Sequence, residues 1–230
     1  MDVSAAIKSV RPKGRLSDAI WSGSSLLPEI ANALGRIAKK FIEDIELDLD
    51  VVDIVLTGSF AGMTWGPGSD LDLHIIIDFS LFKDQDAAKR ACKLAKFKWE
   101  EEHDITIKGI PVEVYVESSD EKPPEATGRW SITKNKWVLQ PPSDVSSYDE
   151  SKVIKKVIDF RKVIQKALKT RKEGPIIAAM KRLIKTRKAG LTRAGELSSE
   201  NLAFRILRRT NELQKAWDDV NDIMDSKLSI

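Results

Sequence analysis

The chain has 230 residues, 42% of them hydrophobic and 32% charged, which suits one full domain or two small ones with buried cores. One cysteine and two histidines exclude an intramolecular disulfide, a cysteine-rich zinc site and a site of several histidines. The net charge of +3 divides unevenly, because residues 1–150 contain 18 basic and 26 acidic residues, whereas residues 151–230 contain 20 basic and 9 acidic residues. This asymmetry predicts two parts with different roles.

The first half of the chain mixes strand and helix patterns after a polar start through residue 23. The first predicted helix begins at Ser25, which can cap it, and places Pro28 in the first turn, where no amide hydrogen is needed. Further along, β-branched runs predict strands, and apolar residues at helical spacing predict a helix. In chain order these are a strand over 51–56, a glycine-rich loop over 57–69, a strand over 71–78, a helix over 84–102, and hairpins over 105–116 and 130–139.

From about residue 148 the apolar residues recur only at helical spacing, which predicts three helices, over 153–167, 176–188 and 198–224. We therefore predict an α/β (α+β) fold in two domains. Residues 1–147 would contain a mixed β-sheet with flanking helices, and residues 148–230 would form a basic α-helical domain.

Two carboxylates open the second long strand. Asp70 and Asp72 are two residues apart, so on a strand they project to the same face and converge. Adjacent carboxylates repel each other unless a cation lies between them, and their hard oxygen atoms suit Mg²⁺. At the end of the preceding strand, Gly58 lets the backbone approach a phosphate closely, and Ser59 offers it a hydroxyl and an amide.

A third carboxylate is needed to hold a second metal ion or to activate an acceptor hydroxyl. Glu113 is a lone acid on a later strand, flanked by Val112 and Val114, and the same strand face also carries Tyr115 and Glu117. Glu117 is the alternative third carboxylate. We favour Glu113 because of its apolar neighbours, whereas Glu117 leads into a polar loop.

These residues, in this order, resemble the polymerase-β-like nucleotidyltransferase superfamily. The pattern consists of Gly58-Ser59, a gap of ten residues, Asp70-x-Asp72 and Glu113, and the resemblance covers residues 25–117. It implies that Asp70, Asp72 and Glu113 are the catalytic residues and hold two Mg²⁺ ions, for which Mn²⁺ can substitute. Many members of the superfamily have Asp where this chain has Glu113.

The resemblance also implies the reaction: template-independent transfer of a nucleoside monophosphate from a nucleoside triphosphate, with ATP or CTP favoured, to a hydroxyl acceptor. The expected nucleotide-binding residues are Gly58, Ser59, Ser69 and His74. His74 is alternatively a hydrogen-bonded histidine that contacts no ligand. Base stacking is an alternative for the aromatic rings of Trp65 and Tyr115, for which we favour core packing.

The favoured acceptor is the 3′ end of an RNA, bound by the basic helical half, because a net charge of +11 over residues 151–230 attracts phosphates. The alternatives are a small-molecule (antibiotic-type) or protein adenylyltransferase, and a non-catalytic nucleic-acid-binding member of the fold. The basic half can also dock on the acidic half instead of binding a ligand. No apolar run is long enough to span a membrane and no signal peptide is evident, so we expect a cytoplasmic protein without a membrane partner.

Two further stretches, residues 128–137 and 194–202, resemble an uncharacterised, often phage-encoded subgroup of nucleotidyltransferases. That resemblance implies no particular substrate.

Overall fold

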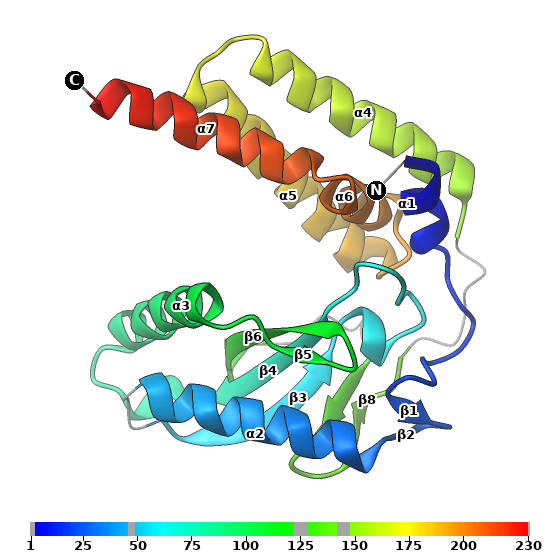
Figure 1. Ribbon diagram of the computed structural model, residues 1–230, viewed down its shortest axis with the longest axis vertical. Coiled ribbons are helices and arrows are strands. Elements are labelled where there is room, and N and C mark those ends of the chain that lie inside the picture. Colours follow the sequence, from blue (N-terminus) through cyan, green and yellow to red (C-terminus); the bar gives the residue numbers. More distant parts are fainter. Residues whose placement is uncertain (1–2, 46–48, 122–127, 142–147, 230) are drawn as a thin grey trace. The chain divides into compact units, whose positions relative to one another are not determined.

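A computed structural model of the chain describes residues 3–45, 49–121, 128–141 and 148–229. The chain divides into two compact units, one of Lys13–Ser143 and one of Met1–Pro12 together with Asp144–Ile230 (Figure 1). Within the described ranges, no helix has the length and apolar character needed to cross a membrane.

The unit Lys13–Ser143 is a mixed β-sheet with helices, which confirms the predicted fold class (Figure 1). Its helical elements are α2 (Pro28–Ile45), η1 (Ser59–Ala61), η2 (Phe79–Leu81) and α3 (Gln85–Glu102). Its strands are β1 (Trp21–Ser22), β2 (Ser25–Leu26), β3 (Val51–Thr57), β4 (Leu71–Ile77), β5 (Thr106–Ile107), β6 (Ile110–Ser118), β7 (Arg129–Ser131) and β8 (Lys136–Leu139).

The main sheet has six strands in the order β5-β6-β4-β3-β7-β8. The pair β4–β6 is parallel, and all the other neighbours are antiparallel. The core lies on one face of this sheet, because β4 alternates fully buried apolar residues with half-buried ones. Its buried members, Leu71, Leu73, Ile75 and Ile77, belong to the same cluster as the buried stripe of α2, made of Ile30, Leu34, Ala38 and Phe41. Asp72 and His74 therefore lie on the opposite face of β4.

The second unit is helical and contains α1 (Val3–Ser9), α4 (Glu150–Leu168), α5 (Glu173–Ala194), α6 (Ser199–Arg209) and α7 (Glu212–Leu228). Two of its helices begin at side-chain caps. Asp149 accepts a hydrogen bond from the Lys152 amide at the start of α4, and Ser198 caps α6, as predicted, through the Asn201 amide. Each helix contributes an apolar face to one separate core.

Three details differ from the sequence-based expectations. Ser25 lies in β2 and does not cap α2, which begins at Pro28. The polar start contains α1, and Ala6 of that helix is buried in the core of the helical unit. The predicted helix over 198–224 is two helices, because Asn211 adopts a left-handed conformation (φ 63°) between α6 and α7.

Candidate active site

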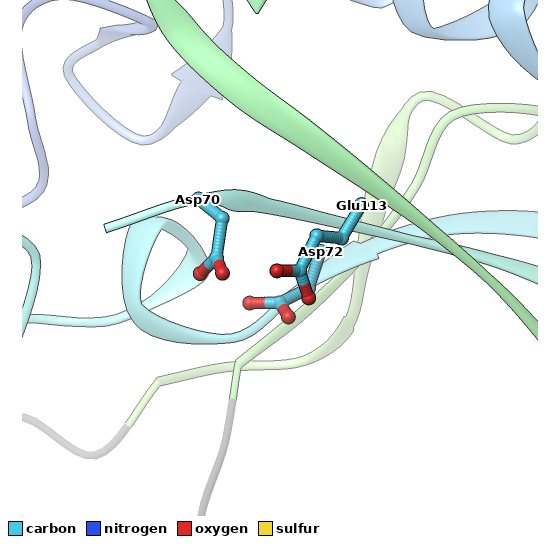
Figure 2. A group of neighbouring side chains, drawn as sticks. All are labelled: Asp70, Asp72 and Glu113. Carbon is cyan, nitrogen blue, oxygen red and sulfur yellow. The ribbon is translucent and has the colours of Figure 1, made fainter. Parts of the chain in front are cut away.

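Three carboxylates converge on the sheet face opposite the core (Figure 2). Asp70 directly precedes β4, Asp72 is its second residue, and Glu113 lies on β6. Asp72 and Glu113 are register partners across the parallel β4–β6 pair, so their side chains leave the sheet side by side. One oxygen from each of the three carboxylates lies within 4.8 Å of the others. The structure thus brings together the three residues that were predicted to hold metal ions.

Gly58 directly follows β3 and lies next to the carboxylates. Its φ of 73° lies in a region that favours glycine, and a Cβ at this position would lie 1.7 Å from Asp72 Oδ2. Thr57, the residue before it, pairs with Asp72 across the antiparallel β3–β4 ladder. The backbone at the end of β3 therefore rests directly against one of the three carboxylates, and only glycine permits this approach.

The loop that follows Gly58 contains the two predicted nucleotide-binding serines. Ser59 is buried at the start of η1. The hydroxyl of Ser69 accepts a hydrogen bond from the Gly66 amide at 3.1 Å, and the Ser69 amide donates to the Gly66 carbonyl at 2.9 Å. Ser69 thus closes the turn that leads into Asp70, which gives it a positional role.

The same loop is held against the start of β7. The hydroxyl of Thr57 donates to the carbonyl of Gly128 at 2.9 Å, and a Cβ on Gly128 would lie 2.0 Å from the carbonyl oxygen of Ala61. Trp65 packs on Phe60 with ring centroids 6.2 Å apart, as its assignment to core packing predicted.

His74 lies one step further along β4 on the carboxylate face and is hydrogen-bonded within the protein. Its Nδ1 is 2.7 Å from Glu117 Oε2, and Arg129 donates to the same oxygen at 3.0 Å. The structure thus gives His74 a hydrogen-bond partner within the protein, and its contact with a nucleotide stays a prediction. Glu117, the competing third carboxylate, is engaged by these two groups and lies outside the group of converging acids.

Burial raises the pKa of Glu117, but the hydrogen bond from His74, together with the charge and hydrogen bond of Arg129, outweighs burial and lowers this pKa below its usual range. The pair is well shielded, since the side chain of Arg129 is 6% exposed and that of Glu117 is 13% exposed. Glu117 is therefore a charged, structurally paired carboxylate.

Arg129→Met is expected to destabilise the protein by about 3 kcal/mol at pH 7, because it removes one partner of a buried ion pair. Since folding lowers the pKa of Glu117, its charge stabilises the fold above about pH 4.5, and that stability is lost as the pH falls through the lower folded-state pKa. The variant and the wild type should therefore converge in stability at low pH. Urea unfolding at pH 7 and pH 3 measures this, and equal stability at pH 7 would show that the pair contributes nothing.

Tyr115 lies beside His74 and donates its hydroxyl to Glu113 Oε2. Burial, the hydrogen bond to Glu113 and the surrounding negative charge raise the pKa of this hydroxyl above its usual range, so it stays protonated at neutral pH and donates a hydrogen bond. Two contacts of this face were not predicted: the Tyr115–Glu113 bond and the Arg129–Glu117 pair. The available signals were a tyrosine two strand positions from a lone acid and an arginine between Gly128 and a tryptophan.

The chemistry of this donor set fits divalent metal ions. Three carboxylates that converge from two adjacent strands repel one another, and oxygen atoms of this kind are preferred ligands of Mg²⁺ and Mn²⁺. A glycine backbone approaches within contact distance of one of them. This donor set is suited to metal-assisted chemistry, such as that of enzymes that act on phosphate groups.

The chain belongs to the nucleotidyltransferase domain family, whose model matches residues 36–172. This range includes all three carboxylates, β3 to β8 and α4. The chain is accordingly a nucleotidyltransferase that uses nucleoside triphosphates, and the predicted family is confirmed.

Two solved structures are similar to the chain at low sequence identity. The STING-associated CdnE c-di-GMP synthase from Capnocytophaga granulosa is 13% identical, with 98% of this chain and 100% of that chain covered and a TM-score of 0.26. The CdnE cyclic dinucleotide synthase from Elizabethkingia meningoseptica, solved with GTP and Apcpp, is 14% identical, with 94% of this chain and 85% of that chain covered and a TM-score of 0.29. No curated protein sequence matches the chain.

Proposed function

We propose that this protein transfers a nucleoside monophosphate from a nucleoside triphosphate to the 3′ hydroxyl of an RNA, in a Mg²⁺-dependent reaction that needs no template. The observation that carries the proposal is the convergence of Asp70, Asp72 and Glu113 within 4.8 Å beside the backbone of Gly58. ATP and CTP are the favoured donors.

The residues of the site have three different parts in this reaction. Asp70 and Asp72 hold both metal ions, and Glu113 completes the site on the side of the acceptor hydroxyl. Gly58 and Ser59 present backbone amides to the triphosphate. Mg²⁺ held by these carboxylates would supply positive charge to offset the negative charge that develops in an in-line displacement. The acceptor hydroxyl releases its proton to solvent, its oxygen forms a bond to the α-phosphorus, the bond from that phosphorus to the bridging oxygen breaks, and pyrophosphate leaves.

The charge of the helical unit supports an acceptor rich in phosphate. Some of its cations are paired within the unit, such as Arg161 with Glu212 and Lys227 with Glu173. Others are exposed and, among the residues that the structure describes, form no ion pair. On α4 and at the residue directly after it, these lie at intervals of seven, four and three residues, which places them on one side of the helix: Lys155, Lys162, Lys166 and Lys169. Such a stripe is suited to a phosphate backbone.

Reversing two charges of this stripe, with Lys162→Glu and Lys166→Glu together, is expected to weaken binding of single-stranded RNA about tenfold at low salt. It should also reduce the slope of log affinity against log salt by about 1–2, because fewer phosphate contacts release fewer counterions. Fluorescence anisotropy over a salt series measures both quantities. Lys39→Glu with Lys40→Glu on α2 gives the same change in net charge, and an equal effect of that control would argue against a specific role for α4.

Labelling of acceptors tests the proposed reaction. The protein is incubated with Mg²⁺, a cell extract and each of the four α-labelled nucleoside triphosphates in turn, beside the variant carrying Asp70→Ala and Asp72→Ala. We expect label in a product that RNase destroys, and none with the variant. If the label survives RNase and is found on a protein or a small molecule, the acceptor belongs to that class and is not RNA. Equal labelling by the variant would refute catalysis at this site.

A further inference from the structure

The third carboxylate of the site is held by a neighbour on its own strand. Glu113 and Tyr115 are two residues apart on β6, so they share a face, and the Tyr115 hydroxyl donates to Glu113 Oε2. A glutamate has three side-chain torsions, and a flexible ligand loses that freedom when it binds a metal ion. A hydrogen bond to one carboxylate oxygen removes part of that freedom before a metal ion binds.

The phenol ring of Tyr115 is itself fixed from two sides. On β4, its register partner His74 packs against it with ring centroids 4.9 Å apart. From α3, the ammonium group of Lys96 lies 4.5 Å from the centre of the ring. His74 is held in turn by Glu117, whose carboxylate also accepts a hydrogen bond from Arg129. The hydroxyl therefore meets Glu113 from a ring that its neighbours have already oriented.

We propose that Tyr115 is a positioning residue for Glu113, which it pre-orients for metal binding. The inference rests on the proposed function, because it takes Glu113 to be a metal ligand. It explains the contacts around Tyr115. His74 and Lys96 pack against its ring, the Glu117–Arg129 pair holds His74 in place, and the Tyr115 hydroxyl orients Glu113. Groups that orient a metal ligand in this way typically contribute 10–100-fold to metal affinity.

Binding of Mn²⁺ alone, followed by the loss of the free-ion signal in electron paramagnetic resonance, tests the proposal without a substrate. Tyr115→Phe removes the hydroxyl and keeps the ring, so we expect Mn²⁺ to bind about 10-fold more weakly or worse. The chain provides a matched control in its second tyrosine, since Tyr148 donates to Glu150 at 3.4 Å across the same two-residue spacing, in the helical unit. Tyr148→Phe should leave Mn²⁺ affinity unchanged. Affinity of Tyr115→Phe within twofold of the wild type would overturn the proposal.

A double-mutant cycle separates positioning from a general structural effect. If the hydroxyl acts through Glu113, Tyr115→Phe should have no further effect on Mn²⁺ binding once Glu113→Gln is present. An equal loss in both backgrounds would overturn the proposal, because the tyrosine would then act by another route. Glu113→Gln and Asp72→Asn also test the site itself: if both bind Mn²⁺ as the wild type does, the proposed function fails together with the inference. If both bind Mn²⁺ more weakly and Tyr115→Phe does not, the inference alone fails.

A spectroscopic measurement keeps the inference testable should Tyr115→Phe fold poorly. With Tyr148→Phe in place, 3-fluorotyrosine labels position 115 alone, because the chain has two tyrosines. Addition of Mg²⁺ should shift this fluorine resonance, and the shift should be lost with Glu113→Gln. A resonance that Mg²⁺ leaves unmoved would show that the tyrosine is not coupled to a metal-binding carboxylate.

Discussion

Asp72→Asn is expected to lower the turnover number of nucleotidyl transfer by about 10³-fold or more. The substitution keeps the shape of the side chain and removes the negative charge at the point where β3, β4 and β6 meet. Metal-ion stabilisation of the transition state amounts to several kcal/mol, and about 4 kcal/mol corresponds to a factor of 10³ in rate. Release of pyrophosphate at saturating triphosphate and Mg²⁺ measures the effect.

A control for this substitution is Asp86→Asn, which makes the same chemical change at an exposed position in the first turn of α3. Its turnover should lie within twofold of the wild type. If Asp72→Asn retained a tenth of the wild-type turnover or more, the carboxylate would not be a ligand of a catalytic metal ion.

Gly58→Ala is expected to abolish measurable transfer, with a loss of at least about 10²-fold, and to destabilise the fold by about 2 kcal/mol. The added methyl would occupy the position of the Asp72 carboxylate, 1.7 Å from Oδ2, and the φ of 73° is unfavourable for alanine. Displacement of a ligand by about 1 Å typically costs a factor of 10² in rate. Turnover and urea unfolding measure the two effects.

Gly23→Ala is a control that introduces backbone strain without a steric clash, whereas Gly58→Ala introduces both. Gly23 also has a positive φ, of 59°, but a Cβ there meets nothing within 4 Å. This variant should lose some stability and keep its activity. Comparable activity of Gly58→Ala and Gly23→Ala would mean that close contact between Gly58 and Asp72 is not required for the reaction.

The period of the apolar residues was enough to predict which residues of β4 face the site. Leu71, Leu73 and Ile75 alternate with polar residues, and the structure buries the apolar set completely. The parallel pairing of β4 with β6, which sets Glu113 beside Asp72, was not visible in this pattern. Register between strands that are distant in sequence depends on tertiary packing, so the third acid could be chosen only from its flanking residues and from the resemblance.

The contacts that distinguish Glu113 from Glu117 as the third carboxylate also involve residues that are distant in sequence. Glu117 forms hydrogen bonds with His74 and Arg129, which are 43 and 12 residues away.

The N-terminal helix α1 was not predicted, because its position also depends on residues that are distant in sequence. It is seven residues long, and Ala6 is buried against helices from the other end of the chain. A helix of that length has little stability of its own and leaves a weak local signal.

A crystal structure of the protein with Mn²⁺ and a non-hydrolysable nucleoside triphosphate tests the central claim most directly. We predict anomalous scattering peaks coordinated by Asp70, Asp72 and Glu113, with the triphosphate against the backbone of Gly58 and Ser59. A triphosphate bound elsewhere, with no Mn²⁺ among the three carboxylates, would contradict the assignment of this site to nucleotidyl transfer.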